Sequence, residues 1–107
     1  MTNQLKLSYE QENYLEQKEQ FLDQFIESND EYKLFVSSYI HGHFSVVVAN
    51  LPEHFTEVDG LESVDLDTFS TTFEQNLRRD IDQAIENNEL SSEDAGRVSD
   101  MLEELFA

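Results

Sequence analysis

The feature that most constrains the fold is a stretch from Leu34 to Leu51 that contains no Asp, Glu, Lys or Arg, although 28% of the chain is charged. In so charged a protein, this stretch is expected to be the most buried element. Serine, histidine and asparagine interrupt it, and its apolar runs are far shorter than the roughly 18 residues of a membrane span. The stretch is therefore predicted to lie in the core of a folded domain.

Helical periodicity sorts the side chains of this stretch onto two sides. At 100° per residue, Ser37, Ser38, His41 and Ser45 fall on one stripe. The opposite side carries apolar residues: Phe35, Val36, Tyr39, Ile40, Val46 and Val47. This separation favours a helix. The alternative is a strand over residues 44–48, because three consecutive valines form a β-branched run.

The rest of the sequence predicts further helices. Apolar residues recur at three and four positions over residues 8–28 and from Asp65 to about residue 87 or 88, and a last helix begins after a predicted capping box at Ser91 and Asp94. Asn29 and Asp30 are predicted to cap the uncharged helix, and residues 53–63 are predicted to form an irregular connector. One proline and three glycines are too few for many short strands. We expect a single all-α domain, residues 1–107, folded as an antiparallel bundle of about four helices.

Charge restricts the class of partner. Six basic residues oppose 24 acidic ones, which gives a formal net charge of −18. Such a surface repels nucleic-acid phosphate and anionic lipid, so we expect neither nucleic-acid nor membrane binding. It attracts a basic protein surface, although solubility alone is the commoner explanation. Eight phenylalanines and four tyrosines argue against a disordered acidic tail. So many aromatic residues in a short chain can also leave an exposed apolar patch, which makes self-association as a homodimer plausible.

The chain has no cysteine, which excludes disulfides, thiolate nucleophiles and sulfur-ligated metal sites and suits a reducing compartment. The first residues lack the basic and apolar regions of a signal peptide, so a cytoplasmic location is expected.

Two segments carry a distinctive combination of residues. The first is residues 30–44, with an acidic lead-in, an apolar run and a Tyr-x-x-Gly-His core. The second is Glu89-Leu90-Ser91, followed by Val98, Asp100-Met101, Glu103 and Leu105-Phe106. In these two segments the chain resembles the YfcL-like family of small bacterial proteins. The resemblance implies an α-helical, cytoplasmic protein and assigns no activity or catalytic residues.

His43 is the most informative single residue. It is predicted to lie near Tyr39 on the apolar face, where a buried imidazole needs partners for its nitrogens. We favour a structural histidine bonded to a carbonyl, a tyrosine or a carboxylate, beside a Gly42 that permits close helix approach. The alternative is a small-molecule or metal site centred on His43. His41 cannot share a metal ion with His43 on a helix, because their side chains diverge by about 160°, whereas on a strand they would share a face. We expect no metal and no cofactor.

An acidic face is predicted on the first helix, opposite its apolar stripe: Glu12, Glu16, Glu19, Asp23 and Glu27. The simpler interpretation is a solvated helix surface. The alternative is a row of carboxylates that contacts a basic protein, including the special case of phosphate mimicry. No nucleophile beside a base, glycine-rich phosphate loop or catalytic carboxylate pair can be assigned. We therefore expect a non-enzymatic protein-interaction or adapter module.

Overall fold

The uncharged stretch forms a helix, α2 (Glu31–Ala49), in the computed structural model, which describes residues 6–55 and 60–107. The strand alternative for residues 44–48 is therefore wrong. The predicted cap is confirmed at Asp30, whose side chain accepts hydrogen bonds from the backbone amides of Tyr32 and Lys33 at 3.0 and 3.3 Å. These bonds satisfy two amide donors that the first turn of a helix leaves free.

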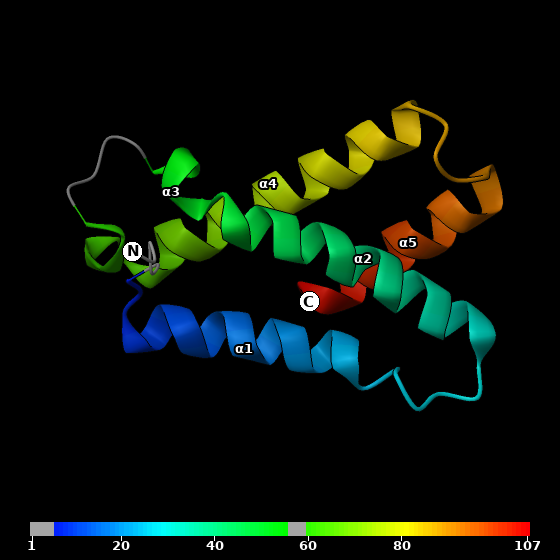
Figure 1. Ribbon diagram of the computed structural model, residues 1–107, viewed down its shortest axis with the longest axis horizontal. Coiled ribbons are helices and arrows are strands. Elements are labelled where there is room, and N and C mark those ends of the chain that lie inside the picture. Colours follow the sequence, from blue (N-terminus) through cyan, green and yellow to red (C-terminus); the bar gives the residue numbers. More distant parts are fainter. Residues whose placement is uncertain (1–5, 56–59) are drawn as a thin grey trace, which may run out of the picture.

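The other elements in the described residues are helical as well. They are α1 (Tyr9–Asp23), α3 (Leu51–His54), a 3-10 turn η1 (Leu61–Ser63), α4 (Leu66–Glu86) and α5 (Ser92–Leu105). Figure 1 shows successive long helices running in opposite directions, with α2 passing in front of α5. Helix α2 packs against α1, α4 and α5. The predicted antiparallel bundle of four long helices is confirmed.

The predicted boundaries of α4 and α5 are confirmed. The side chain of Asp65 caps α4 by accepting from the Thr68 amide at 3.0 Å, and this bond helps hold the pKa of Asp65 below its usual value. After α4, Asn88 adopts the left-handed conformation with φ 62°, which stops the helix. Ser91 caps α5 through the Asp94 amide at 3.1 Å. Only this half of the predicted capping box is present, because the Asp94 side chain does not bond back to Ser91.

Helix α1 is shorter than predicted. It ends at Asp23 instead of near residue 28, because the chain tightens into a turn in which the Ile26 amide donates to the Asp23 carbonyl at 3.0 Å. The Gln24 side chain donates to the Phe21 carbonyl at 2.9 Å and so occupies an acceptor at the helix end. Ile26, predicted to belong to the buried stripe, is 63% exposed as a result.

The connector begins with more structure than expected. Pro52 lies in the first turn of α3, where its missing amide costs no hydrogen bond. Residues 56–59 of the predicted connector lie outside the described part of the chain.

The core is built where the four long helices meet. Its fully buried apolar side chains come from all four long helices and the start of α3: Leu22, Ile40, Leu51, Phe69, Phe73, Leu77, Ile81 and Val98. The three- and four-residue spacing correctly predicted the buried residues of α4 from Phe69 to Ala84, whereas Leu66, the first residue of the predicted series, is 36% exposed. Burial of this apolar surface is the main force that holds the bundle together.

The two sides of α2 are not divided as predicted. Ser37 is buried, and its hydroxyl donates to the Leu34 carbonyl at 3.1 Å, whereas Phe35 and Val46 are 44% and 49% exposed. Three helices cover α2, so the buried arc is wider than one apolar stripe and includes polar positions. Gly42 also differs from expectation, because nothing lies within 4 Å of where its Cβ would be. No other helix of residues 6–55 and 60–107 approaches it closely.

Tyr14 joins α1 to α4 and gives the bundle a measurable pH dependence. Its ring meets Phe69 and Phe73 edge-on, with both centroid distances at 6.1 Å. Burial, reinforced by the negative charge of Glu74, raises the pKa of Tyr14 from 10.0 to about 12. The folded state therefore holds this proton at pH values where the unfolded chain has lost it.

We predict that Tyr14→Phe reduces the alkaline loss of stability. Between pH 10 and about 12 the unfolded state binds fewer protons than the folded state, so the free energy of unfolding falls as pH rises. Replacing Tyr14 with Phe removes this contribution. Urea unfolding from about pH 9 to about pH 11.5 should show a flatter decline for Tyr14→Phe than for wild type. Tyr9→Phe is the control, because Tyr9 is 82% exposed. Equal slopes for all three proteins would contradict the prediction.

Candidate functional site

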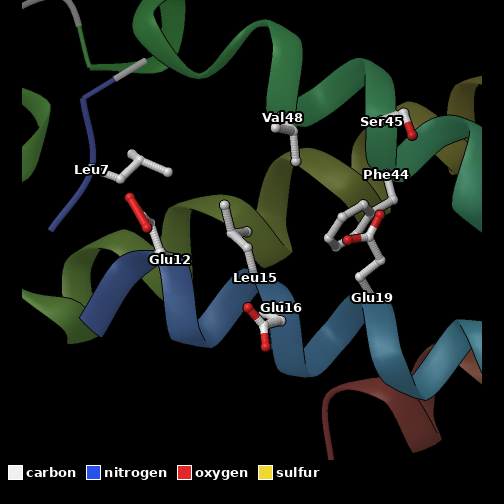
Figure 2. Close-up of a pocket in the computed structure, with 8 residues that line it drawn as sticks. All are labelled: Leu7, Glu12, Leu15, Glu16, Glu19, Phe44, Ser45 and Val48. Carbon is white, nitrogen blue, oxygen red and sulfur yellow. The ribbon is translucent and has the colours of Figure 1, made fainter. Parts of the chain in front are cut away.

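A groove between α1 and α2 combines an apolar floor with an acidic border. Its volume is about 360 Å³. Figure 2 shows the residues that line it: Leu7, Glu12, Leu15, Glu16, Glu19, Phe44, Ser45 and Val48. Leu15 and Phe44 are buried members of the core, and Val48 and Leu7 pack against that core. The groove therefore offers apolar contacts below and carboxylates along its α1 side.

The acidic border follows from the helical periodicity of α1. Leu15 points into the bundle. Glu12, Glu16 and Glu19 lie three residues before, one residue after and four residues after Leu15, and helical periodicity places all three along one edge of the apolar face of α1. These three predicted residues thus line the groove beside α2, instead of lying opposite the apolar stripe. Glu27 is not part of this row, because α1 ends at Asp23.

His41 joins the acidic row to α2. Its Nε2 lies 3.2 Å from the Glu19 carboxylate and 3.9 Å from that of Asp23. The His41 ring also stacks on Phe44, with ring centroids 6.1 Å apart. The predicted residues His41, Glu19 and Asp23 are therefore brought together at one end of the groove, a grouping that the sequence analysis did not foresee.

Gln11 fixes the start of α1, and with it the acidic border. It is fully buried, and its Nε2 donates to the carbonyls of Leu61 and Val64, both at 2.9 Å. Its backbone amide and side-chain oxygen form a complete capping box with Ser8, at 3.1 and 2.9 Å. One side chain thus holds the first turn of α1, next to Glu12, against η1. Sequence analysis missed this contact, since its partners lie at least 50 residues away along the chain.

We predict that Gln11→Leu destabilises the protein by about 2 kcal/mol. The substitution keeps a similar side-chain volume but leaves two partly buried carbonyl groups without this donor, which costs about 1–3 kcal/mol. Urea unfolding followed by circular dichroism measures the change. Gln20→Leu is the matched control, because Gln20 is exposed and bonds only to Glu16 of its own helix. A loss of stability as large in Gln20→Leu would show that Gln11 has no special role.

His43 lies on the α4 side of α2, away from the groove. Its Nδ1 is 2.6 Å from the Asp80 carboxylate, and its side chain is 21% exposed, less buried than expected because it lies at the margin of the α2–α4 contact. The Tyr39 ring packs beside it, with centroids 4.8 Å apart. The ring therefore has a carboxylate partner in the folded protein. Nothing in the sequence pointed to Asp80, which is 37 residues away.

Tyr39 completes this second cluster. Burial raises the pKa of its hydroxyl, and the negative charges of Glu89 and Asp80 add to the effect. The hydroxyl is buried and has no hydrogen-bond partner of good geometry among the described residues. The neutral hydroxyl is therefore strongly favoured at physiological pH.

The two histidines of α2 face different neighbours. His41 contacts α1 through Glu19, and His43 contacts α4 through Asp80, so the two rings are directed to opposite sides of the helix. Within residues 6–55 and 60–107, no three His, Asp or Glu side chains are grouped as a metal site.

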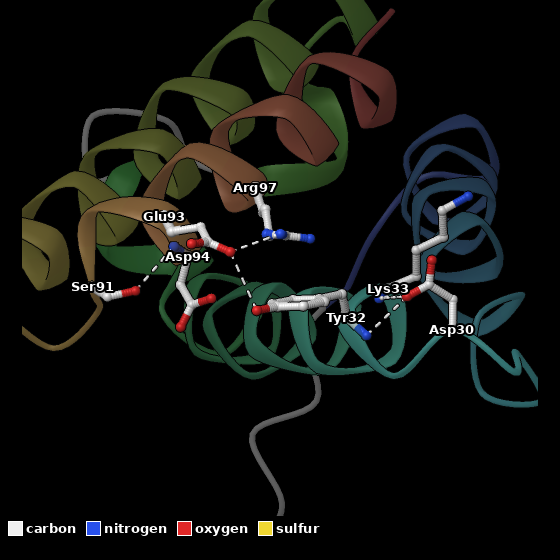
Figure 3. A network of polar contacts seen from close by, with 7 residues as sticks. All are labelled: Asp30, Tyr32, Lys33, Ser91, Glu93, Asp94 and Arg97. Atoms are coloured by element: carbon white, nitrogen blue, oxygen red, sulfur yellow. Dashed lines mark hydrogen bonds and ion pairs between the residues drawn. The ribbon is translucent and has the colours of Figure 1, made fainter.

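A polar network at the other end of α2 was not foreseen. The guanidinium of Arg97 lies 3.4 Å above the Tyr32 ring and bonds to Glu93 at 2.8 Å, and the Tyr32 hydroxyl donates to the same carboxylate at 3.3 Å (Figure 3). The hydrogen bond from Arg97 lowers the pKa of Glu93. The four-residue spacing of Glu93 and Arg97 was the only sequence signal. The network ties α5 to the start of α2.

The fold and the groove define the class of protein: a small all-α bundle with an acidic, apolar-floored groove between its first two helices. None of the helices in the described segments is long and apolar enough to cross a membrane. The chain belongs to the YfcL family, whose model, described as YfcL protein, matches residues 12–107. This confirms the family resemblance noted in two segments of the sequence. Comparisons with curated proteins and with solved structures found no match.

Proposed function

We propose that this protein is a non-enzymatic interaction module whose α1–α2 groove receives a basic, amphipathic segment of another protein. The observation that carries the proposal is the row of Glu12, Glu16 and Glu19 beside an apolar floor. A segment with apolar side chains on one face and lysine or arginine beside them matches both parts of this groove. Binding of an amphipathic helix in an apolar groove is a common mode of peptide recognition.

The length of the groove suggests the length of the segment. Residues 12 to 19 of α1 span about 10 Å, which corresponds to about two helical turns of a partner. Apolar side chains at spacings of three and four residues would contact the floor, and basic side chains would face the carboxylates. Apolar burial would supply most of the affinity, whereas the charges would favour basic partners and speed association.

The charges of the chain support a basic protein as partner, in preference to a nucleic acid or an anionic lipid. Glu12 and Glu16 make no ion pair with a basic side chain of the described residues. With a net charge of −18 the chain repels phosphate groups. A nucleic-acid-binding protein is one kind of partner that fits, and nucleic acid would then compete for it. The absence of cysteine supports a cytoplasmic location.

The alternative function centred on His43 has less support. The Nδ1 of His43 is already hydrogen-bonded to the Asp80 carboxylate, and the Tyr39 ring packs against the imidazole. Self-association as a homodimer stays a prediction from the aromatic content of the sequence.

We predict that the double variant Glu12→Gln/Glu16→Gln weakens binding of a basic amphipathic peptide by about 5- to 30-fold. Two lost exposed charge contacts amount to about 1–2 kcal/mol. The probe is a synthetic helical peptide of leucine and lysine with leucines at three- and four-residue spacing. Fluorescence anisotropy measures its affinity. Affinity for the wild type should also fall with added salt, since salt screens exposed charges.

The matched control is Glu10→Gln/Glu103→Gln, which changes the net charge equally at exposed positions outside the groove. A scrambled peptide of the same composition, with its leucines dispersed, should bind much more weakly to all variants. Equal losses in the two double variants would mean that the peptide senses only net charge. Equal binding of the ordered and scrambled peptides would exclude a role for the apolar floor. Either result would overturn the groove as the binding site.

A further inference from the structure

His41 lies at one end of the groove and contacts two of the residues that line it. Its Nε2 is 3.2 Å from the Glu19 carboxylate, and its ring stacks on Phe44 with centroids 6.1 Å apart. Both of these residues line the groove (Figure 2). Asp23, one helical turn beyond Glu19 on α1, lies 3.9 Å from the same nitrogen. The groove therefore has a histidine beside one end of its acidic row.

The charge of an imidazole ring changes near neutral pH, whereas that of a carboxylate does not. The ordinary pKa of histidine is about 6.5, and that of glutamate is about 4.3. Glu19 and Asp23, both on α1, are the charged groups that face the His41 ring. In residues 6–55 and 60–107, α4 and α5 bring no charged side chain within ion-pair distance of this ring. The His41 side chain is 37% exposed, so solvent can protonate it without unfolding the protein.

We propose that His41 makes the groove sensitive to pH by competing, in its protonated form, with the basic side chains of the bound segment. This inference rests on the function proposed above for the groove. A protonated ring partly neutralises Glu19 and Asp23, and it repels a lysine or arginine placed beside them. A neutral ring leaves both negative charges for the bound segment. The affinity of the groove for a basic segment should therefore rise from about pH 5.5 to about pH 7.5.

The change in affinity should be modest, because only one end of the groove responds to pH. Glu12 and Glu16 make no ion pair with a basic side chain of the described residues, so they attract the segment at both pH values. Exposed ion pairs contribute little, and the loss of one changes an affinity about two- to fivefold. His43 faces Asp80 on the α4 side of the helix, at 2.6 Å, and is not part of the groove. His41 thus adjusts the binding strength of the groove without closing it.

Substitutions at His41 separate the effects of its two charge states. Fluorescence anisotropy with the leucine–lysine peptide measures affinity at about pH 5.5 and about pH 7.5, where the peptide lysines stay charged. The wild type should bind about two- to fivefold more tightly at the higher pH. His41→Gln, which is neutral at both pH values, should bind as tightly at the lower pH as the wild type does at the higher. His41→Lys, which is charged at both, should bind as weakly at either pH as the wild type does at the lower.

His54→Gln is the matched control, because His54 is an exposed histidine outside the groove. This variant should keep the pH response of the wild type. Circular dichroism checks that all variants remain folded at both pH values. Equal affinity of the wild type at the two pH values, or an unchanged pH response in His41→Gln, would overturn the role of His41 and leave the groove as the binding site. No binding of the peptide at either pH would overturn the groove itself, and this inference with it.

Proton release on binding gives a second, independent measurement. Because the neutral ring favours the bound segment, binding must in turn favour loss of the proton from His41. Isothermal titration calorimetry at about pH 6.5, in two buffers of different ionisation enthalpy, measures how many protons are released. The wild type and His54→Gln should release a fraction of a proton per bound peptide, and His41→Gln should release less. Equal release from all three proteins would contradict the proposal.

Discussion

The structure depends on the burial of the uncharged part of α2 in a strongly acidic chain. Water solvates the carboxylates of α1, α4 and α5 well, whereas α2 offers only apolar and small polar side chains over residues 34–51. Covering α2 is therefore the main way for this chain to remove apolar surface from water. Three helices pack around it, and Ile40, Phe44 and Val47 become core residues. Helix α1 packs against α2 and covers part of its apolar surface. The groove lies between these two helices.

Helical periodicity and capping residues, which are local in the sequence, predicted the fold well. The site was predicted less well, because it depends on contacts between residues that are far apart in the sequence. The caps at Asp30, Asp65 and Ser91 depend on side chains within three residues of the amides that they bind, so the sequence contains them in full. The pairing of His43 with Asp80 and the clamp of Gln11 on η1 join residues far apart. No periodicity encodes such partners, because they depend on how two helices are rotated against each other.

The faces of α2 show why one apolar stripe was too simple a description. A helix packed on one neighbour has one buried stripe, but α2 has three neighbours. Ser37 could be buried because its hydroxyl bonds to a carbonyl of its own helix. Phe35 and Val46 were predicted to be buried because they are apolar, yet they are 44% and 49% exposed. Hydrophobicity alone does not distinguish a core residue from an exposed one.

The groove and the core share residues of α2. Phe44 lines the groove and is also a buried core residue, and Val48 packs against that core. The packing of α1 on α2 therefore determines the shape of the groove, because the same side chains support both. The carboxylates of Glu12, Glu16 and Glu19 stay exposed along the α1 side of the groove, so they are charged beside an apolar surface without the cost of burying a charge. This combination of a shared apolar surface and exposed carboxylates is what distinguishes the groove from an ordinary seam between two helices.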